Sequence, residues 1–480
     1  MRNGRVCQLL LNFLIDSTMA LLDHFDISKI LRASLKNGGD FADIFYEYVQ
    51  PTSIVCEDGK VEKIISGIDV GVGLRVIYQD KTAYAYTNQI TNKGLFEMAD
   101  EISSSCKGRV FEKDISLKRK QPEIDHSIKR MPQEVSIDEK VSLVRRADDV
   151  ARSLDKRIKQ VRVVYVDSVR RIAVANIEGE LVEDHRTGIM FIVKVVAAQG
   201  DVIQTGYEPI GGFIGFELFE ELPPEKVAET ASNRALKMLQ ARRAPGGRMS
   251  VVLSSEAGGT MVHEAIGHGL EADLAQVGLS VYTGRIGEEV ASTLVTVVDD
   301  ATLAHKRGSY AFDDEGVRAQ RTILVEQGVL KGYLYDRLTA MKDHTLSTGN
   351  GRRESYHSRP LPRMSNTFIL PGQMCPEEIV LSTPQGLFVK KMGGGQVNTI
   401  NGDFVFEVSE GYLIENGKIG EAVRGATLIG NGPALLKNID MVGSDFGFGI
   451  GTCRKDEQGV PVSDAQPTLR IPEIIVGGEV

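Results

Sequence analysis

The feature that most constrains the fold of this chain is a series of β-rich runs separated by two-residue glycine turns. Asp58-Gly59 lies between the runs Thr52–Glu57 and Lys60–Ser66, and Asn416-Gly417 divides a second such pair near the C-terminus. Both residues of these pairs tolerate positive φ angles, which tight hairpin turns require. A hairpin joins antiparallel neighbours. The sequence therefore predicts an α+β chain with mainly antiparallel sheets.

Helical and extended segments alternate in the first half of the chain. Capping residues predict helices at Asp26–Leu35 and Ser136–Leu154. A proline in the first turn and apolar residues at helical spacing predict another at Pro224–Leu239, and a further helix is expected near Lys93–Ser105. Strands are expected at Asp43–Val49, Val70–Tyr78, Thr82–Thr87, Ile158–Asp167, Arg170–Asn176 and Leu181–Gln199.

The chain has 480 residues, enough for two or three domains. Pro245-Gly246-Gly247 ends a predicted helix, and short β segments dominate after it. We expect an extension at 1–19, an α+β domain at 20–240 with a connector near 112–135, and a β-rich domain at 245–480. The β-rich C-terminal half would be built around a strand–helix metal motif.

Composition excludes several classes of protein. A net charge of −9 leaves no basic field for nucleic acid. The five cysteines are odd in number and scattered, which predicts a reducing cytoplasm and no disulfide framework. The apolar run Val6–Ile15 is too short to span a bilayer, and although it imitates a secretory leader we favour a cytoplasmic interpretation. No membrane association is expected.

The stretch TMVHEAIGHGLEAD, Thr260–Asp273, follows a predicted strand and a glycine turn. Its histidines, His263 and His268, are five positions apart. On a regular α-helix that separation is about 140°, so the two rings would point away from each other. A single π-type turn would return both rings to one face, and such turns are frequent at functional sites. The spacing therefore predicts a locally widened or unwound helix, and it is compatible with a metal site.

A catalytic zinc ion needs three protein ligands and one open position. Cys453, in GIGTCRKDEQGVPV, is expected in a glycine-rich polar loop where a thiolate is approachable. Rival third ligands are Glu271, Asp273, His305, His344 and His357. Either carboxylate just after His268 could instead hold a histidine ring in its ligating tautomer. Spacing alone leaves open that both histidines are ordinary polar residues.

The segment VHEAIGHGLEAD, taken with GTCRKDEQGVPVSDAQPTLRI, resembles the TldD/PmbA family, and specifically its TldD branch. RRESYHSRPLPRMSNTFI and MGGGQVNTINGDFVFEV are also similar to that branch, and the likeness covers residues 20–480 but not 1–18. The resemblance implies a C-terminal metallopeptidase domain whose zinc ion is held by His263, His268 and Cys453, with Glu264 as general base. It also implies a heterodimer with a PmbA-like subunit, or else a homodimer. The family's association with DNA gyrase is not interpreted as direct DNA binding.

The resulting hypothesis is a zinc-dependent peptidase for unfolded or extended peptides and small proteins, in which Glu264 activates a zinc-bound water. Substrate would be captured by backbone pairing at an exposed strand edge, such as Gly393–Thr399 beside Phe404–Val408. One alternative is a non-catalytic peptide-binding or regulatory subunit with a vestigial metal site. Another is a structural zinc site, although such sites prefer four closed ligands.

Overall fold

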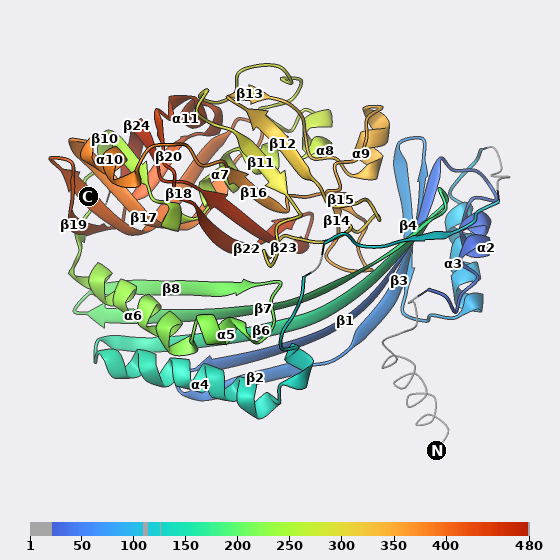
Figure 1. The fold of residues 1–480 in the computed structure, drawn as a ribbon, viewed down its shortest axis with the longest axis horizontal. Coiled ribbons are helices and arrows are strands. Elements are labelled where there is room, and N and C mark those ends of the chain that lie inside the picture. The colour runs from blue at the N-terminus through green and yellow to red at the C-terminus, as the bar shows by residue number, and fades with distance from the viewer. Residues whose placement is uncertain (1–21, 109–113, 125, 479–480) are drawn as a thin grey trace.

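The computed structural model describes residues 22–108, 114–124 and 126–478, so the predicted extension at 1–19 lies outside the described residues. A long, curved sheet forms the N-terminal part, and the C-terminal part lies above it (Figure 1). The fold is α+β with mostly antiparallel sheets, as predicted. No helix among the described residues is long and apolar enough to cross a membrane.

The N-terminal sheet has eight strands in the order β4-β3-β1-β6-β7-β5, with β2 paired to β1 and β8 paired to β7. Its strands are β1 (Phe41–Glu57), β2 (Lys60–Ser66), β3 (Asp69–Tyr78), β4 (Lys81–Thr87), β5 (Lys118–Lys120), β6 (Ile158–Asn176), β7 (Glu180–Gln199) and β8 (Val202–Gly212). Its helices are α2 (Ile27–Ser34), α3 (Asn92–Ser103), α4 (Ile137–Leu154), α5 (Leu218–Glu221) and α6 (Pro224–Gln240). Helices α4 and α6 cover one face of this sheet (Figure 1).

Local sequence patterns account for several of these elements. The Asp58-Gly59 hairpin between β1 and β2 is confirmed, as is the helix that begins after Ser136, whose hydroxyl accepts the Glu139 amide at 3.2 Å. The predicted break between Ile158–Asp167 and Arg170–Asn176 is wrong, because β6 is continuous. Ser168 in its middle pairs with Pro51 on one side and Gly188 on the other.

The C-terminal part contains two larger sheets. One has the order β17-β10-β24-β20-β18-β19-β9, and β17 also pairs with β18, so that five strands close into a ring. Its strands are β9 (Arg242–Arg243), β10 (Gly247–Leu253), β17 (Gln385–Val397), β18 (Asp403–Glu415), β19 (Lys418–Arg424), β20 (Thr427–Asn431), β21 (Met441–Val442) and β24 (Leu469–Gly477). The hairpin predicted at Asn416-Gly417 joins β18 and β19.

The other sheet has the order β13-β12-β11-β16-β23-β22, so β22 lies at its edge. Its strands are β11 (Val297–Asp300), β12 (Arg321–Glu326), β13 (Val329–Leu330), β16 (Asn366–Ile369), β22 (Gly447–Lys455) and β23 (Gln458–Gln466). The remaining elements are α7 (Thr260–Val262), α8 (Ala272–Gln276), β14 (Gly351–Arg352), α9 (Arg337–Lys342), β15 (Leu361–Pro362), α10 (Pro376–Leu381) and α11 (Gly432–Asn438).

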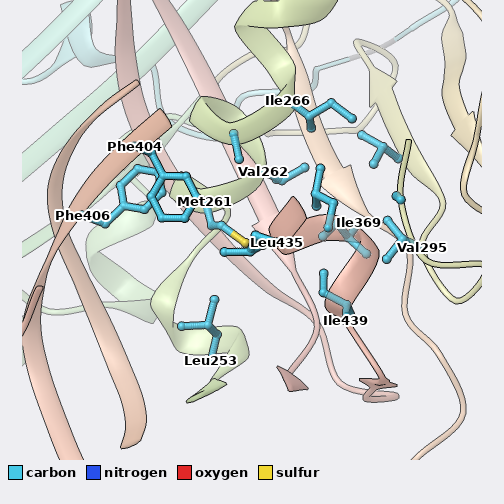
Figure 2. Packing of buried hydrophobic residues seen from close by; sticks show 14 of the residues in the cluster. Leu253, Met261, Val262, Ile266, Val295, Ile369, Phe404, Phe406, Leu435 and Ile439 are labelled. Atoms are coloured by element: carbon cyan, nitrogen blue, oxygen red, sulfur yellow. The ribbon is translucent and has the colours of Figure 1, made fainter. Parts of the chain in front are cut away.

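The helical segment that carries the histidines is buried in the C-terminal core. Met261, Val262 and Ile266 pack among apolar side chains from the surrounding elements (Figure 2). Phe404 and Phe406 of β18 and Leu435 of α11 belong to the same cluster. This packing fixes the helical segment, and with it the direction of its polar side chains.

Candidate metal centre

The two histidines lie on a helix whose middle turn is widened. Thr260–Val262 is α-helical, His263–Gly267 forms a π turn, and His268–Leu270 continues as a 3-10 turn. The predicted π-type turn is therefore confirmed. Glycine allows close packing here: a Cβ on Gly267 would lie 2.2 Å from the buried Met364 Sδ and would displace that side chain.

The widened turn brings the two imidazoles together. Their ring centroids are 5.0 Å apart and the rings are nearly perpendicular. Cys453 joins them from β22, with its Sγ 3.4 Å from His268 Nε2. One possible ligand atom from each of the three residues lies within 4.8 Å of the other two. In the part of the chain that the structure describes, no other three His, Cys, Asp or Glu residues converge this closely.

The rival third ligands lie elsewhere. Glu271 and Asp273 face away from the shared space, toward His268 Nδ1 and Lys455 respectively. The other three rivals are the histidines of later loops. His305 Nδ1 is hydrogen-bonded to the Phe213 carbonyl, the His357 ring lies tilted against Tyr356, and His344 is exposed.

The expected loop around Cys453 is wrong. Cys453 lies within the regular strand β22, opposite Val460 of β23, and is only 4% exposed. The glycines before it belong to the same strand. They allow close packing: a Cβ on Gly447 would lie 2.2 Å from the Ser255 carbonyl oxygen. The thiol therefore approaches the helix from a rigid element.

The electrostatics of the group favour a thiolate. Burial alone raises the pKa of Cys453, but hydrogen bonds and charge from His263 and His268 lower it to about 5. Burial lowers the pKa of both imidazoles, yet Cys453 raises the pKa of His263, and Glu271 and then Cys453 raise the pKa of His268. A metal ion would compete with these protons for the same nitrogen and sulfur atoms.

Behind His268, Glu271 fixes the orientation of the ring. The Glu271 carboxylate is 3.1 Å from His268 Nδ1, which leaves Nε2 directed at Cys453. Burial raises the pKa of Glu271, but Lys455 and His268 lower it to about 2. Lys455 Nζ donates to Glu271 at 3.0 Å and to Asp273 at 2.7 Å.

Behind His263, the corresponding carboxylate is Asp464 of β23. Its Oδ2 lies 3.9 Å from His263 Nδ1, a buried nitrogen with no hydrogen-bond partner, and its Oδ1 accepts the Gly259 amide at 3.1 Å. Sequence reasoning missed both Asp464 and Lys455. The two-residue period of a strand could have indicated Lys455, which shares a face with Cys453.

Glu264, the predicted general base, differs from its neighbour in exposure. Its side chain is partly exposed, whereas His263 beside it is buried. Among the described residues its carboxylate has no hydrogen-bond or ion-pair partner.

The donor set suits a divalent metal. Two imidazole nitrogens and one thiolate are typical zinc ligands, and in a tetrahedral site such atoms lie about 3.5 Å apart. The 3.4 Å separation of Cys453 Sγ from His268 Nε2 agrees with that spacing. Three protein donors would leave a fourth position free, as in catalytic rather than closed structural sites.

Three family models match the chain in succession. They are the PmbA/TldA metallopeptidase domain 1 at residues 42–106, the central domain at 130–239 and the C-terminal domain at 246–478. A metalloprotease TldD homolog of Haemophilus influenzae is 37% identical, with 96% of each chain covered. A zinc metalloprotease TldD homolog of Saccharolobus solfataricus is 29% identical, with 94% of this chain and all of the relative covered.

Solved structures share the fold. A candidate modulator of a DNA gyrase from Thermotoga maritima has a TM-score of 0.76 at 24% identity, covering 91% of this chain and 96% of its own. TldE from Thermococcus kodakarensis has a TM-score of 0.73 at 19% identity, covering 94% and 99%. These similarities establish the fold, at identities too low to carry an activity.

Proposed function

The chain belongs to the PmbA/TldA metallopeptidase family, and on that premise we propose that it is a zinc-dependent peptidase acting on unfolded or extended peptides and small proteins. The observation that carries the proposal is the convergence of His263, His268 and Cys453 from segments 185 residues apart. Only a packed fold can bring these atoms together. Their number, three, matches that of catalytic zinc sites, which keep a fourth position open for water or substrate.

In this proposal His263, His268 and Cys453 hold the zinc ion, while Glu271 and Asp464 orient the imidazoles. A bound zinc ion would lower the pKa of a water molecule and polarise the scissile carbonyl. The Glu264 carboxylate takes one proton from the attacking water while the water oxygen bonds to the carbonyl carbon. Glu264 then gives that proton to the leaving nitrogen as the C–N bond breaks.

The edge strand β22 offers a track for the substrate beside this site. The Ser463 amide of β23 is bonded on the far side, to Ser365, and Pro461 has no amide hydrogen. The β22 residues opposite them, Ile450 and Thr452, therefore direct their own N–H and C=O groups toward the free edge. An extended peptide can pair with these groups regardless of its side chains.

The glycine pattern of β22 supports the same track. Gly451 precedes Cys453 by two positions and shares its face. A Cβ on Gly451 would touch only Val462 Cγ2, at 3.5 Å, so that face is open. Peptide binding at the strand edge Gly393–Thr399 stays a second proposal. Strand β10 pairs with β17 only as far as Val389, so the later part of β17 has β18 as its one strand neighbour.

Two further proposals concern the setting of the activity. We propose a cytoplasmic location, because a thiolate ligand needs reducing surroundings and the described cysteines Cys56, Cys106, Cys375 and Cys453 are all free. We also propose a dimer, either with a PmbA-like subunit or with a second copy. Sedimentation of the chain alone and with such a subunit distinguishes the two assemblies.

The decisive experiment replaces the general base. Glu264→Gln is expected to retain one zinc ion per chain by elemental analysis and to lose about 10²–10⁴-fold in peptide cleavage, because only proton transfer is removed. Glu256→Gln is the matched control, since Glu256 is an exposed carboxylate just before the same helix. Full activity in Glu264→Gln would refute the proposed role. A zinc-loaded wild type that binds peptides without cleaving them would favour the non-catalytic subunit.

A further inference from the structure

Two adjacent cations, Lys306 and Arg307, lie on the face of the β22–β23 sheet opposite the metal ligands. Arg307 Nε donates to the Gly451 carbonyl at 3.2 Å and its Nη2 lies 3.4 Å from Thr452 Oγ1. Lys306 Nζ lies 3.9 Å from the centre of the Phe448 ring. Thr452 and Phe448 alternate with Cys453 along β22, so the cations lie beside the strand that carries the thiolate.

These cations lack counter-ions. Within the described chain, no Asp or Glu oxygen lies within 4.0 Å of the charged atoms of Lys306 or Arg307, or of the neighbouring buried Arg352. Arg352 donates instead to the carbonyls of Met364 and Pro461. Other buried arginines of the chain are paired, for example Arg186 with Asp184 and Asp314. Charge that is partly buried without a partner is costly to retain.

The pKa values of Lys306 and Arg307 are both lowered, as expected for partly buried cations without a counter-ion. Burial lowers the pKa of Lys306. Burial and the nearby positive charge of Arg352 lower the pKa of Arg307 to about 10. Both side chains are still cationic at neutral pH, so this face carries a positive potential that an anion would neutralise.

The loop that presents the cations is held in an unusual conformation. His305 has a φ of 59°, in the left-handed region, and its Nδ1 is hydrogen-bonded to the Phe213 carbonyl at 3.0 Å. The loop thereby faces β8 of the N-terminal sheet, where Tyr207 is 45% exposed. Strained backbone of this kind persists where surrounding structure enforces it, and is common at ligand-binding sites.

We infer that Lys306 and Arg307 form a carboxylate-binding subsite for a peptide laid along the free edge of β22. The carboxylate would come from an Asp or Glu side chain or from the C-terminus of the peptide. A strand added to β22 alternates its side chains between the two faces, so every second residue faces the cations while the backbone stays beside Cys453. A guanidinium forms strong charge-assisted bonds with a carboxylate, and Arg307 Nη1 donates to no described residue.

The inference rests on the proposed function, because that proposal gives the path of the peptide along β22. The subsite itself can be tested by measuring peptide affinity, without any cleavage. In the Glu264→Gln background, fluorescence anisotropy would compare labelled peptides of one sequence that carry a single Glu or Gln at successive positions. Each peptide is made with a C-terminal carboxylate and with a C-terminal amide. We expect about 10-fold or more tighter binding for a carboxylate at positions of one parity, or at the C-terminus.

Arg307→Gln and Lys306→Gln are expected to bring the carboxylate-to-amide affinity ratio near one, Arg307→Lys to restore part of it, and Arg307→Glu to favour a Lys peptide. Arg321→Gln, an exposed arginine on β12, removes one charge far from β22 and should keep the wild-type ratio. A ratio near one with Lys306 and Arg307 both intact, or an unchanged ratio in both glutamine variants, would overturn the subsite. Absence of cleavage by the zinc-loaded wild type would sink the peptidase proposal and leave the binding ratio informative.

Discussion

At the scale of single residues, the groups behind the imidazoles explain why two histidines point at one thiolate. Glu271 contacts His268 Nδ1, and Asp464 lies beside His263 Nδ1. A ring nitrogen that faces a carboxylate carries the proton, so the opposite nitrogen offers its lone pair to a metal. Lys455 and Arg363 surround the buried Glu271 carboxylate and keep it ionised.

This arrangement predicts that Glu271→Gln weakens zinc affinity about 10–100-fold, because the neutral amide no longer favours the correct tautomer of His268. The measurement is competition for zinc with a chelating dye, with circular dichroism to show that the variant is folded. Asp273→Asn is the control, since Asp273 pairs with Lys455 without touching either imidazole. Identical zinc affinities for Glu271→Gln and wild type would contradict the orienting role.

The sequence predicts that either Glu271 or Asp273 orients a histidine ring, and it does not distinguish between the two. The choice depends on where the helix ends. The 3-10 turn stops at Leu270 and Glu271 is already extended, with φ −73° and ψ 121°. That change of direction returns Glu271 to His268 and carries Asp273 past it. Spacing alone does not reveal it.

At the scale of elements, the π turn brings the imidazoles of His263 and His268 together. Five-residue spacing and the two flanking glycines were sufficient to predict it, because a regular helix cannot place both rings on one face. The prediction of a loop around Cys453 is wrong because the local sequence does not contain the contacts that explain its glycines. Glycines at 447, 449 and 451 indicate a turn in a sequence, but in β22 Gly447 and Gly449 let the strand pack against Ser255 and Gly258, just before the helix. The contact that requires them is remote in sequence.

Deletion of Ala265 tests the register of the π turn. The variant restores the four-residue histidine spacing of a regular helix, yet we expect it to bind zinc at least about 10-fold more weakly. Removing one residue leaves about one regular α turn, which keeps both rings on one face. It also shifts the buried Ile266 and Gly267 out of their packing sites and so displaces the His268 ring from Cys453. Equilibrium dialysis measures the loss, and Ala265→Ser is a control that keeps the register. Wild-type affinity in the deletion would show that the widened turn is not needed.

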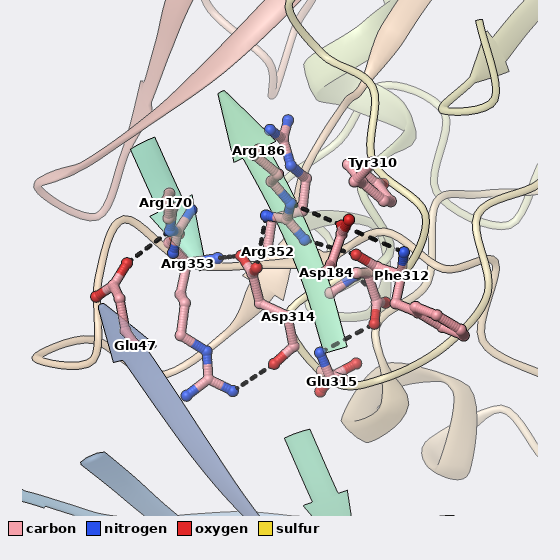
Figure 3. A network of polar contacts seen from close by, with 12 residues as sticks. Glu47, Arg170, Asp184, Arg186, Tyr310, Phe312, Asp314, Glu315, Arg352 and Arg353 are labelled. Carbon is pink, nitrogen blue, oxygen red and sulfur yellow. Dashed lines mark hydrogen bonds and ion pairs between the residues drawn. The ribbon is translucent and has the colours of Figure 1, made fainter. Parts of the chain in front are cut away.

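At the scale of the whole molecule, buried ion pairs join the N-terminal sheet to the C-terminal part (Figure 3). Arg75 of β3 contacts both Asp43 of β1 and Glu315, and Arg186 of β7 contacts Asp314. Arg75 and Glu315 are 240 residues apart. Hydrophobic periodicity does not reveal such pairs, since buried charges look like surface charges in a sequence. The α+β class was therefore predictable, whereas the contacts that orient the two parts were not.

The carboxylates of this junction make stability depend on pH. Burial, and then the negative charge of Glu315, raise the pKa of Asp336 to about 7. A folded-state pKa above the unfolded value means that the fold favours the protonated acid. The stabilisation from Asp336 is complete below about pH 4. It is lost as the pH rises through 7.

Asp336→Asn mimics the protonated acid, and its carbonyl can still accept the Thr339 amide that Asp336 caps at 2.8 Å. Relative to wild type, we expect the variant to gain about 1–4 kcal/mol in unfolding free energy at pH 8 compared with pH 5. Urea unfolding of both proteins at the two pH values measures this difference. Asp201→Asn, in the exposed β7–β8 turn, should show no such gain. An Asp336→Asn effect that is the same at both pH values would mean that the acid is already ionised at pH 5, and that Arg75 outweighs both burial and Glu315 at this junction.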